Sequence, residues 1–324
     1  MSTYDALPYE DYAHPEATPA HLAAVAWMFG HPAAPPARAR VLEIGCATGG
    51  HLLPLAEAFP EAQFVGLDLS AAQIAQAEAH RDALGLGNVT LLARSFTDLD
   101  DSLGRFDYVL CHGVWSWVSP ALQPALLDAV RARLAPDGVA LVSYNTLPGW
   151  SVGLALRDYL RQHVDAALPV AAQVERARGA LALLLAPAAV HDGAVLRALR
   201  AEARRALDAD ASYLFHEYLE ADNHPVYLRD FVAAARASGL GYLGDAKLPR
   251  NLLGALGAPH AVAMDQTADF LHARRFRAAM LVQGDRPPAR RPEPAVLAAL
   301  RWSTPFALAA DADAASLRRD EALA

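Results

Sequence analysis

Residues 41–50 read VLEIGCATGG, and residues 65–70 read VGLDLS. This pattern predicts a buried strand, a glycine turn, a short helix, and a second strand that ends at Asp68. Gly45 and Gly49 let the backbone turn tightly and approach a ligand without a Cβ in the way. Asp68, with Leu69 after it, stands where a carboxylate can accept hydrogen bonds from both hydroxyls of a ribose. The stretch therefore predicts a nucleoside site at the carboxyl edge of a parallel sheet.

The kind of nucleoside depends on Glu43. The dinucleotide fingerprint G-x-G-x-x-G is matched only weakly, because Ala47 replaces its second glycine. A carboxylate two residues before the first glycine would repel a pyrophosphate, but it suits a ligand that carries an ammonium group and a sulfonium. The pattern E-x-G-x-A-x-G that starts at Glu43 resembles the first motif of class I S-adenosylmethionine-dependent methyltransferases. This resemblance implies S-adenosylmethionine as the cofactor.

Composition and charge limit the class of protein. The chain has 324 residues, of which 54% are hydrophobic and 20% are charged, so it is long enough for one large domain or two medium ones. No apolar run reaches the roughly 18 residues that span a bilayer, and the N-terminus lacks a signal-peptide core. The net charge of −8 argues against broad nucleic-acid binding. We expect a cytoplasmic protein with no membrane span and no nucleic-acid partner.

The order of the predicted elements indicates the fold. Strands alternate with helices up to residue 150, which predicts a parallel sheet with helices on both faces. Residues 151–222 are rich in Ala, Leu and Arg and have helical periodicity. Two later strands, at 240–248 and 276–283, are expected to be the sixth and seventh, the last one antiparallel. The expected fold class is α/β, a Rossmann-like seven-stranded methyltransferase sheet with a helical insert after strand five.

These patterns divide the chain into five segments. They are an N-terminal arm and helix (1–38), the cofactor-binding Rossmann-like core (39–150), a helical insert or lid over the carboxyl edge (151–222), the completion of the core sheet (223–283), and a linker with the start of a further domain (284–324). In the arm, Tyr4, Tyr9 and Tyr12 are expected either to fold over the cofactor or to pack on the core. Cys46 and Cys111 are not expected to form a disulfide.

Three further blocks resemble one bacterial group of these methyltransferases. They read FDYVLCHGVWSWV at 106–118, SYNTLPGW at 143–150 and YLFHEYLE at 213–220. The group carries a methyltransferase regulatory domain after the catalytic core, and it includes rickettsial protein-lysine methyltransferases. The resemblance covers residues 4–283 and implies methyl transfer, with a protein lysine or similar amine as acceptor. Members are usually longer than this chain, so we expect a fragment or a short variant.

The resemblance assigns the cofactor to residues at the ends of strands one to four. These are Glu43, Gly45, Ala47, Gly49, Asp68, Leu69, Ser95, Phe96 and His112. Ser95 and Phe96 end strand three, where this fold contacts adenine. The aspartate that is usual at that point is missing, unless Asp98 takes its place.

The acceptor chemistry suggests the catalytic candidates. A lysine has a reference pKa of about 10.4 and must react as a neutral amine, so a dry aromatic site next to a sulfonium favours the reaction. The catalytic candidates are His112, Trp115 and Tyr144, with His112 as a general base or as a group that orients the acceptor. The alternatives are a turn histidine for His112 and a core residue for Tyr144. Trp117 is expected in the core.

The stretch 213–220 is expected to bring Glu217 and Tyr218 to the acceptor, with a structural role as the alternative, which would leave the acceptor site to the loop 112–117. No histidine pair has the spacing of a zinc site, so no metal is expected.

Three functions stay open. They are N-methylation of a protein lysine or similar amine, methylation of a small molecule with the insert as lid, and a non-catalytic cofactor-binding protein that regulates a partner. A homodimer is also left open.

Overall fold

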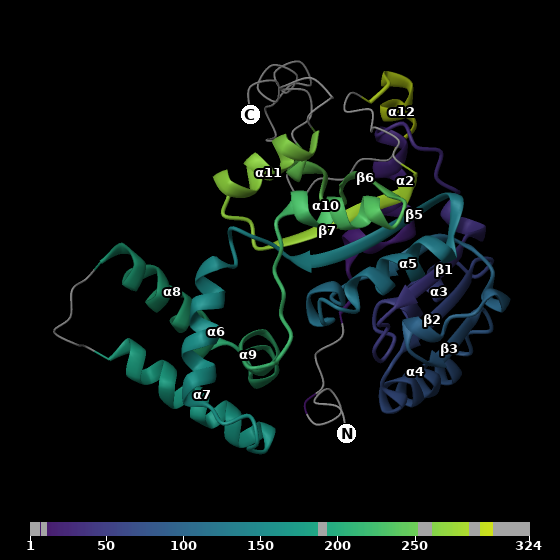
Figure 1. The fold of residues 1–324 in the computed structure, drawn as a ribbon. Coiled ribbons are helices and arrows are strands. Elements are labelled where there is room, and N and C mark those ends of the chain that lie inside the picture. Colours follow the sequence, from purple (N-terminus) through teal and green to yellow (C-terminus); the bar gives the residue numbers. More distant parts are fainter. Residues whose placement is uncertain (1–6, 8–11, 187–192, 252–260, 285–291, 301–324) are drawn as a thin grey trace, which may run out of the picture. The chain divides into compact units, whose positions relative to one another are not determined.

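The computed structural model describes Leu7 and residues 12–186, 193–251, 261–284 and 292–300. Within these residues seven strands form one sheet (Figure 1). They are β1 (Arg40–Ile44), β2 (Gln63–Asp68), β3 (Val89–Ala93), β4 (Phe106–Cys111), β5 (Leu134–Asn145), β6 (Leu240–Asp245) and β7 (Phe276–Gln283). Their order is β3-β2-β1-β4-β5-β7-β6, and β7 runs antiparallel to both neighbours. The predicted fold class, including the antiparallel last strand, is confirmed.

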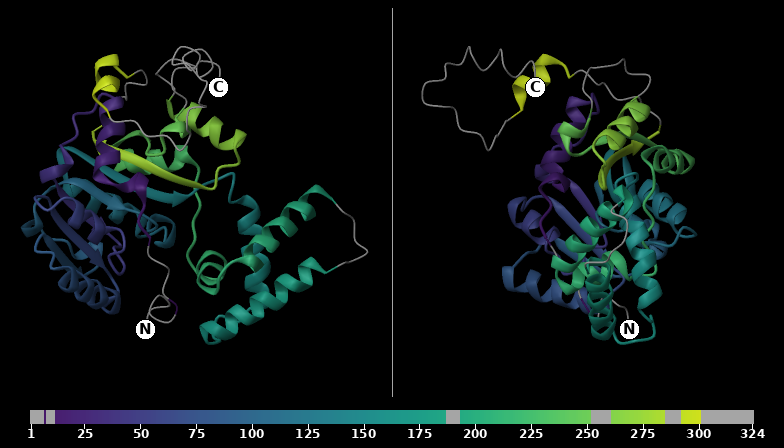
Figure 2. Two further views of the ribbon diagram at one scale, coloured as in Figure 1. Left: turned by 180° about the vertical axis from the view of Figure 1, so that it is seen from behind. Right: turned by 90° about the vertical axis from the view of Figure 1, so that its left-hand side faces the viewer.

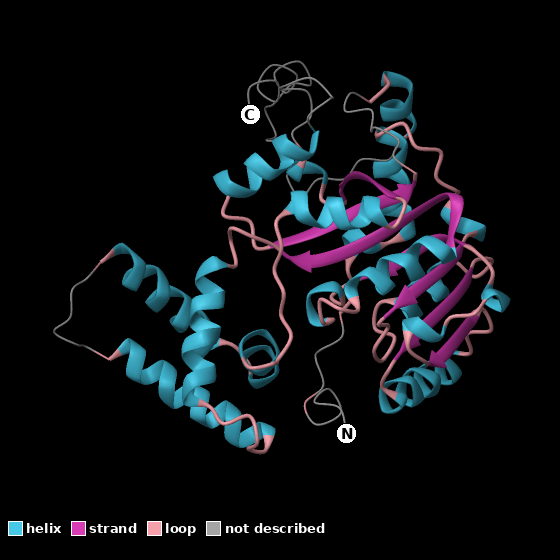
Figure 3. Cartoon of the chain, viewed as in Figure 1, coloured by secondary structure: helices cyan, strands magenta, loops and turns pink. Residues whose placement is uncertain are grey.

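Helices cover both faces of the sheet (Figure 3). They are α2 (Pro19–Met28), α3 (Leu52–Ala58), α4 (Ala71–Leu84), α5 (Gln123–Arg133), α10 (Leu228–Ala237) and α11 (Ala261–Leu271). Residues of α2, α3 and α4 pack on one face, and residues of α5 and α10 pack on the other. Val109 and Leu110 belong to opposite cores because successive side chains of a strand point to opposite faces. This double burial explains the continuous apolar runs in the sequence.

Between β5 and α10 the described chain forms a group of four helices, which we call the helical block (Figure 2). They are α6 (Ser151–His163), α7 (Val170–Leu185), α8 (Ala194–Asp208) and α9 (Ala211–Tyr218). The block has a hydrophobic core of its own. Two arginines link α7 and α8. Arg178 of α7 donates to the carbonyls of Leu207 and Ala209 at the end of α8, and Arg200 of α8 donates to the carbonyl of Leu184 at the end of α7. These carbonyls lie at helix ends, where backbone groups lack partners within the helix.

Short elements complete the description. The 3₁₀ helices are η1 (Pro15–Ala17), η2 (Pro36–Arg38), η3 (Phe96–Asp98), η4 (Asp101–Leu103), η5 (Trp115–Trp117) and η6 (Leu248–Arg250). β5 begins at Leu134, which pairs with Phe106 of β4, and the register of the two strands shifts between Phe106 and Tyr108. The chain divides at Pro292 into two compact units, and α12 (Pro294–Ala299) belongs to the second.

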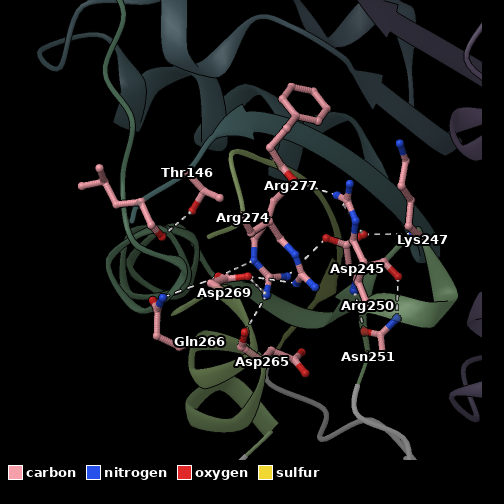
Figure 4. A network of polar contacts seen from close by, with 12 residues as sticks. Thr146, Asp245, Lys247, Arg250, Asn251, Asp265, Gln266, Asp269, Arg274 and Arg277 are labelled. Atoms are coloured by element: carbon pink, nitrogen blue, oxygen red, sulfur yellow. Dashed lines mark hydrogen bonds and ion pairs between the residues drawn. The ribbon is translucent and has the colours of Figure 1, made fainter. Parts of the chain in front are cut away.

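A buried ionic network joins β6, β7 and α11 (Figure 4). Arg277 on β7 donates to both carboxylate oxygens of Asp269 at 2.8 Å and to Asp245 on β6 at 3.2 Å. None of these three side chains is exposed. Buried charges are tolerated only when they are paired, so the network fixes how the three elements meet. It thereby holds the start of β7, where Arg275 and Phe276 reach the cavity described next.

Candidate active site

A cavity of about 880 Å³ lies at the carboxyl ends of the parallel strands. Its wall includes the last residues of β1 and β2 and the residues that follow β3 and β4. The order of strands reverses between β1 and β4, and ligands of open α/β sheets bind at such a switch point. The cavity therefore lies at the carboxyl edge of the sheet, where the sequence pattern predicts a nucleoside site.

One part of the cavity gathers the residues assigned to the cofactor. Eight of the nine line it together, namely Glu43, Gly45, Ala47, Asp68, Leu69, Ser95, Phe96 and His112. Gly49 is not in the wall. It has φ of +83°, and a Cβ there would lie 2.9 Å from Cγ of Leu53, so it shapes the turn before α3. Asp98 is exposed and does not line the cavity, whereas Ser95 does.

The glycine turn brings the backbone close to the ligand site. Gly45 has φ of +79°, and a Cβ at this position would come within 2.6 Å of a methyl group of Val114. Ala47 also has a positive φ, of 46°, which is uncommon for a residue with a side chain. Its amide donates to Asp68 Oδ2 at 3.0 Å, and the amide of Ser70 donates to Oδ1 at 2.9 Å. Asp68 thus holds the turn and keeps its carboxylate fixed at the cavity.

The charges at this end fit S-adenosylmethionine. Glu43 is buried, with 4% of its surface exposed, and it lies in the cavity wall beside the glycine turn. A buried carboxylate can bind an ammonium group, and a carboxylate at the end of β2 is a suitable acceptor for ribose hydroxyls. Two carboxylates would repel the pyrophosphate of a dinucleotide. The donor and acceptor set therefore favours a cationic nucleoside over NAD.

Three histidines form one side of the cavity. The ring of His14 stacks on that of His112, with centroids 3.6 Å apart, and the backbone amide of His14 donates to Nδ1 of His51 at 3.2 Å. Burial, with repulsion by His14, lowers the pKa of His112 to about 3 and that of His51 to about 4. Both rings are therefore neutral near pH 7. A neutral imidazole with so low a pKa is a weak proton acceptor, which argues against His112 as a general base.

The helical block supplies the remainder of the wall. Tyr213, His216 and Glu217 of α9 line the cavity, together with Trp150 before α6 and Arg275 before β7. Arg275 lies over the ring of Trp150, 4.5 Å from its centroid. Both of its Nη atoms donate to Glu202 of α8 at 2.9 Å. The cavity is thus formed jointly by the sheet and the block.

Glu217 is the buried carboxyl in this part of the wall. Asn145, the last residue of β5, donates from Nδ2 to Glu217 Oε2 at 3.5 Å and to Asn223 Oδ1 at 3.0 Å. Burial raises the pKa of Glu217 to about 7, against the opposing effects of the Asn145 hydrogen bond and the charges of Arg275 and Arg157. The carboxyl can therefore exchange a proton near neutral pH.

Two of the proposed catalytic residues lie elsewhere. Tyr144 and Trp115 are buried in the core against Phe231, whose ring centroid is 4.1 Å from that of Tyr144 and 5.2 Å from that of Trp115. Neither lines the cavity. Tyr144 points to the α10 face because side chains alternate along a strand, so Asn145 faces the cavity instead.

The two tryptophans of η5 exchange their expected places. Trp117 lines the cavity, whereas Trp115 is in the core. The loop is held in this orientation because Ser116 Oγ accepts from the amide of Asn145 at 2.8 Å, and the Ser116 carbonyl accepts from the amide of His224 at 2.9 Å. Hydrophobicity alone could not distinguish the two rings.

Other expectations for the site have mixed outcomes. Tyr218 is fully buried in the helical block and donates to Glu202 Oε1 at 2.7 Å, so it does not reach the cavity. Tyr12 lines the cavity, whereas Tyr4 and Tyr9 lie outside the described residues. Cys46 and Cys111 are buried free thiols. Within the described ranges no group of side chains is arranged to hold a metal, and no helix has both the length and the apolar character to cross a bilayer.

Comparison with known proteins agrees with this site. Residues 41–138 match the family described as "Methyltransferase domain", and residues 210–283 match "Predicted methyltransferase regulatory domain". The chain is 35% identical over 291 residues to the uncharacterised protein RP789 of Rickettsia prowazekii, covering 87% of this chain and 53% of that protein. It is 34% identical over 234 residues to RP028 of the same organism, covering 72% of this chain and 94% of that protein.

A solved structure has the same fold. PKMT2 from Rickettsia typhi, in complex with AdoHcy, superimposes with a TM-score of 0.79 at 34% identity, covering 90% of this chain and 57% of that one. The chain thus spans about half the length of RP789 and of PKMT2. AdoHcy is the demethylated form of the cofactor expected from the sequence. The match to both domains, and to nearly all of RP028, shows that the chain belongs to the S-adenosylmethionine-dependent methyltransferase family that carries a methyltransferase regulatory domain.

Proposed function

We propose that this chain transfers the methyl group of S-adenosylmethionine to an amine, and that the amine is the side chain of a lysine in a protein. The observation that carries the proposal is the shared cavity, which Glu43 and Asp68 line together with Asn145 and Glu217. The first pair suits the cofactor, and the second pair suits an amine. A non-catalytic cofactor-binding protein has no need for a continuous space between the two.

The cofactor-side residues act by binding and orientation. Asp68 would accept the ribose hydroxyls, Glu43 would bind the ammonium group, and Ser95 and Phe96 would lie beside adenine. The bound cofactor supplies an electrophilic methyl group on a sulfonium. Because the glycine turn is fixed by Asp68, little reordering is needed on binding, which favours a defined position of that methyl group.

The acceptor-side residues favour an amine. Trp117 and Tyr213 line the cavity and offer aromatic surface to an aliphatic chain and to an ammonium group. Glu217, of which only 8% is exposed, would be reached by a slender chain such as that of lysine. The name PKMT2 of the matched Rickettsia typhi structure agrees with protein-lysine methylation. A small free amine is the second candidate, because it would satisfy the same groups.

Two measurements test the proposal. Calorimetry should show binding of S-adenosylmethionine and AdoHcy and no comparable binding of NAD. Purified protein incubated with methyl-labelled S-adenosylmethionine and a lysate of the source cells should label proteins, and mass spectrometry should locate the label on lysine. Label confined to small molecules would favour the second candidate. Binding of NAD without binding of AdoHcy would reject the cofactor assignment.

A further inference from the structure

The backbone of Glu217 is held firmly while its carboxyl is not. Arg157 donates from Nη1 to the Glu217 carbonyl at 2.8 Å, and Asn223 donates from Nδ2 to the same oxygen at 3.2 Å. The carboxyl receives the single 3.5 Å contact from Asn145, the only hydrogen bond to it among the described residues. The backbone of Glu217 is therefore fixed at the cavity wall, and its carboxyl keeps most of its acceptor capacity.

The cations around Glu217 are engaged elsewhere. Arg275 is paired with Glu202, and Arg157 donates to the carbonyls of Glu217 and Glu220. In the described parts of the chain neither forms an ion pair with the Glu217 carboxyl. His216 and Tyr213, both on α9, are the other titratable groups that face it. A buried carboxylate without a cation partner favours binding of a cation from outside.

We propose that Glu217 is the residue that binds the ammonium group of the methyl acceptor and accepts its proton. The inference rests on the proposed function and adds the group that prepares the amine. An N–H proton passes from the acceptor nitrogen to a Glu217 carboxylate oxygen. The freed lone pair of nitrogen then forms the N–C bond, while the S–C bond breaks and its electron pair stays on sulfur. The proton on Glu217 afterwards leaves to solvent.

Two other residues of the wall, His112 and Asp68, are less suited to accept the proton. His112 is a neutral ring stacked on His14, with a pKa held near 3 by burial and by His14. Asp68 already accepts two backbone hydrogen bonds within the glycine turn. Glu217, with its pKa raised to about 7, is a wall residue that can alternate between charged and neutral forms at neutral pH.

The test compares wild type with Glu217→Gln and with Glu175→Gln. Glutamine keeps the shape of the side chain and can still accept from Asn145. Glu175 is exposed on α7, so its variant changes the net charge equally without touching the cavity. Binding of n-butylammonium chloride to the AdoHcy-loaded protein is followed by NMR. Glu217→Gln should bind it at least tenfold more weakly than the other two proteins, and equal affinity in all three would overturn the proposal.

A second readout uses methyl transfer to protein in the labelled lysate. At pH 7.5, Glu217→Gln should transfer methyl groups about 100-fold more slowly, the size expected for loss of a general base. Its AdoHcy affinity should stay within about twofold of wild type. The wild-type rate should rise with pH through about 7, as the carboxyl loses its proton, and this rise should be absent in the variant. A variant as active as wild type, with the same pH profile, would overturn the role of Glu217 alone. A wild type that binds no AdoHcy would instead overturn the proposed function.

Discussion

Asp68 is a single residue that holds the glycine turn and that we propose binds the ribose of the cofactor. Asp68→Ala should weaken AdoHcy binding by about 1.5–3 kcal/mol, the range for loss of charge-assisted hydrogen bonds. The substitution should also affect folding, because the amides of Ala47 and Ser70 would lose their acceptor. A decrease in stability of about 1 kcal/mol should accompany the lost affinity.

Calorimetry and thermal unfolding measure the two effects separately. Asp98→Ala is the matched control, because Asp98 is an exposed aspartate outside the cavity wall. It should leave AdoHcy affinity unchanged. If Asp98→Ala instead weakened binding and Asp68→Ala did not, the ribose contact would belong to Asp98.

Tyr144 offers a second residue-scale prediction. Its hydroxyl is buried without a hydrogen bond among the described residues, and burial raises its pKa. Tyr144→Phe removes this unsatisfied group, so stability should stay the same or increase by about 1 kcal/mol. Methyl transfer should remain near the wild-type rate, because the ring packs on Phe231 outside the cavity. A large loss of activity in a stable variant would contradict this prediction and indicate that Tyr144 has a role in catalysis.

At the scale of elements, one ion pair connects the helical block to the sheet. Glu202 on α8 accepts from Arg275, which precedes β7, and from Tyr218 and Arg205 within the block. Burial alone would raise the pKa of Glu202, but hydrogen bonds from Arg275 and Tyr218 hold it below its usual range. The carboxylate is therefore charged, and its ion pair with Arg275 connects the helical block to the start of β7.

Glu202→Gln should lower the free energy of unfolding by about 2 kcal/mol, because the half-buried Arg275 loses its counter-charge. Urea denaturation measures this, and hydrogen exchange should locate the loosening in α8 and α9. The exposed control Glu175→Gln should behave as wild type. AdoHcy affinity should change little, since the residues proposed to bind the cofactor lie at the strand ends and not in the block. Equal stability of both variants would show that the ion pair does not hold the block.

At the scale of the whole molecule, the buried histidines predict sensitivity to acid. The pKa of His51 is about 4 and that of His112 about 3 in the folded protein, whereas unfolded histidine has a pKa of about 6.5. Below pH 6.5 the unfolded chain therefore binds more protons, and stability decreases as pH falls. Glu217 opposes this between pH 7 and 4.5, because its raised pKa makes the folded state bind an extra proton.

Two histidines outweigh one carboxyl, so the net loss should be about 1 kcal/mol per pH unit from pH 6.5 to 4.5. Thermal unfolding at pH 7.0 and 5.5 measures it. His51→Gln should lose less stability between these two conditions than wild type. His163→Gln, which changes an exposed histidine of α6, should lose as much as wild type. The same acid response in all three proteins would mean that His51 is not the cause.

The sequence by itself determined the sheet and most of the cofactor side of the cavity. Glu43, Gly45 and Asp68 lie at the ends of β1 and β2, and the carboxyl ends of parallel strands meet at one edge. The local sequence pattern was therefore sufficient to predict that these residues lie together. The tertiary structure decided the part of the wall that we propose binds the acceptor, where Asn145 meets Glu217 across 72 positions and Arg275 meets Glu202 across 73. It also decided that Trp117 rather than Trp115 faces the cavity. These outcomes depend on packing between distant segments, which no local pattern encodes.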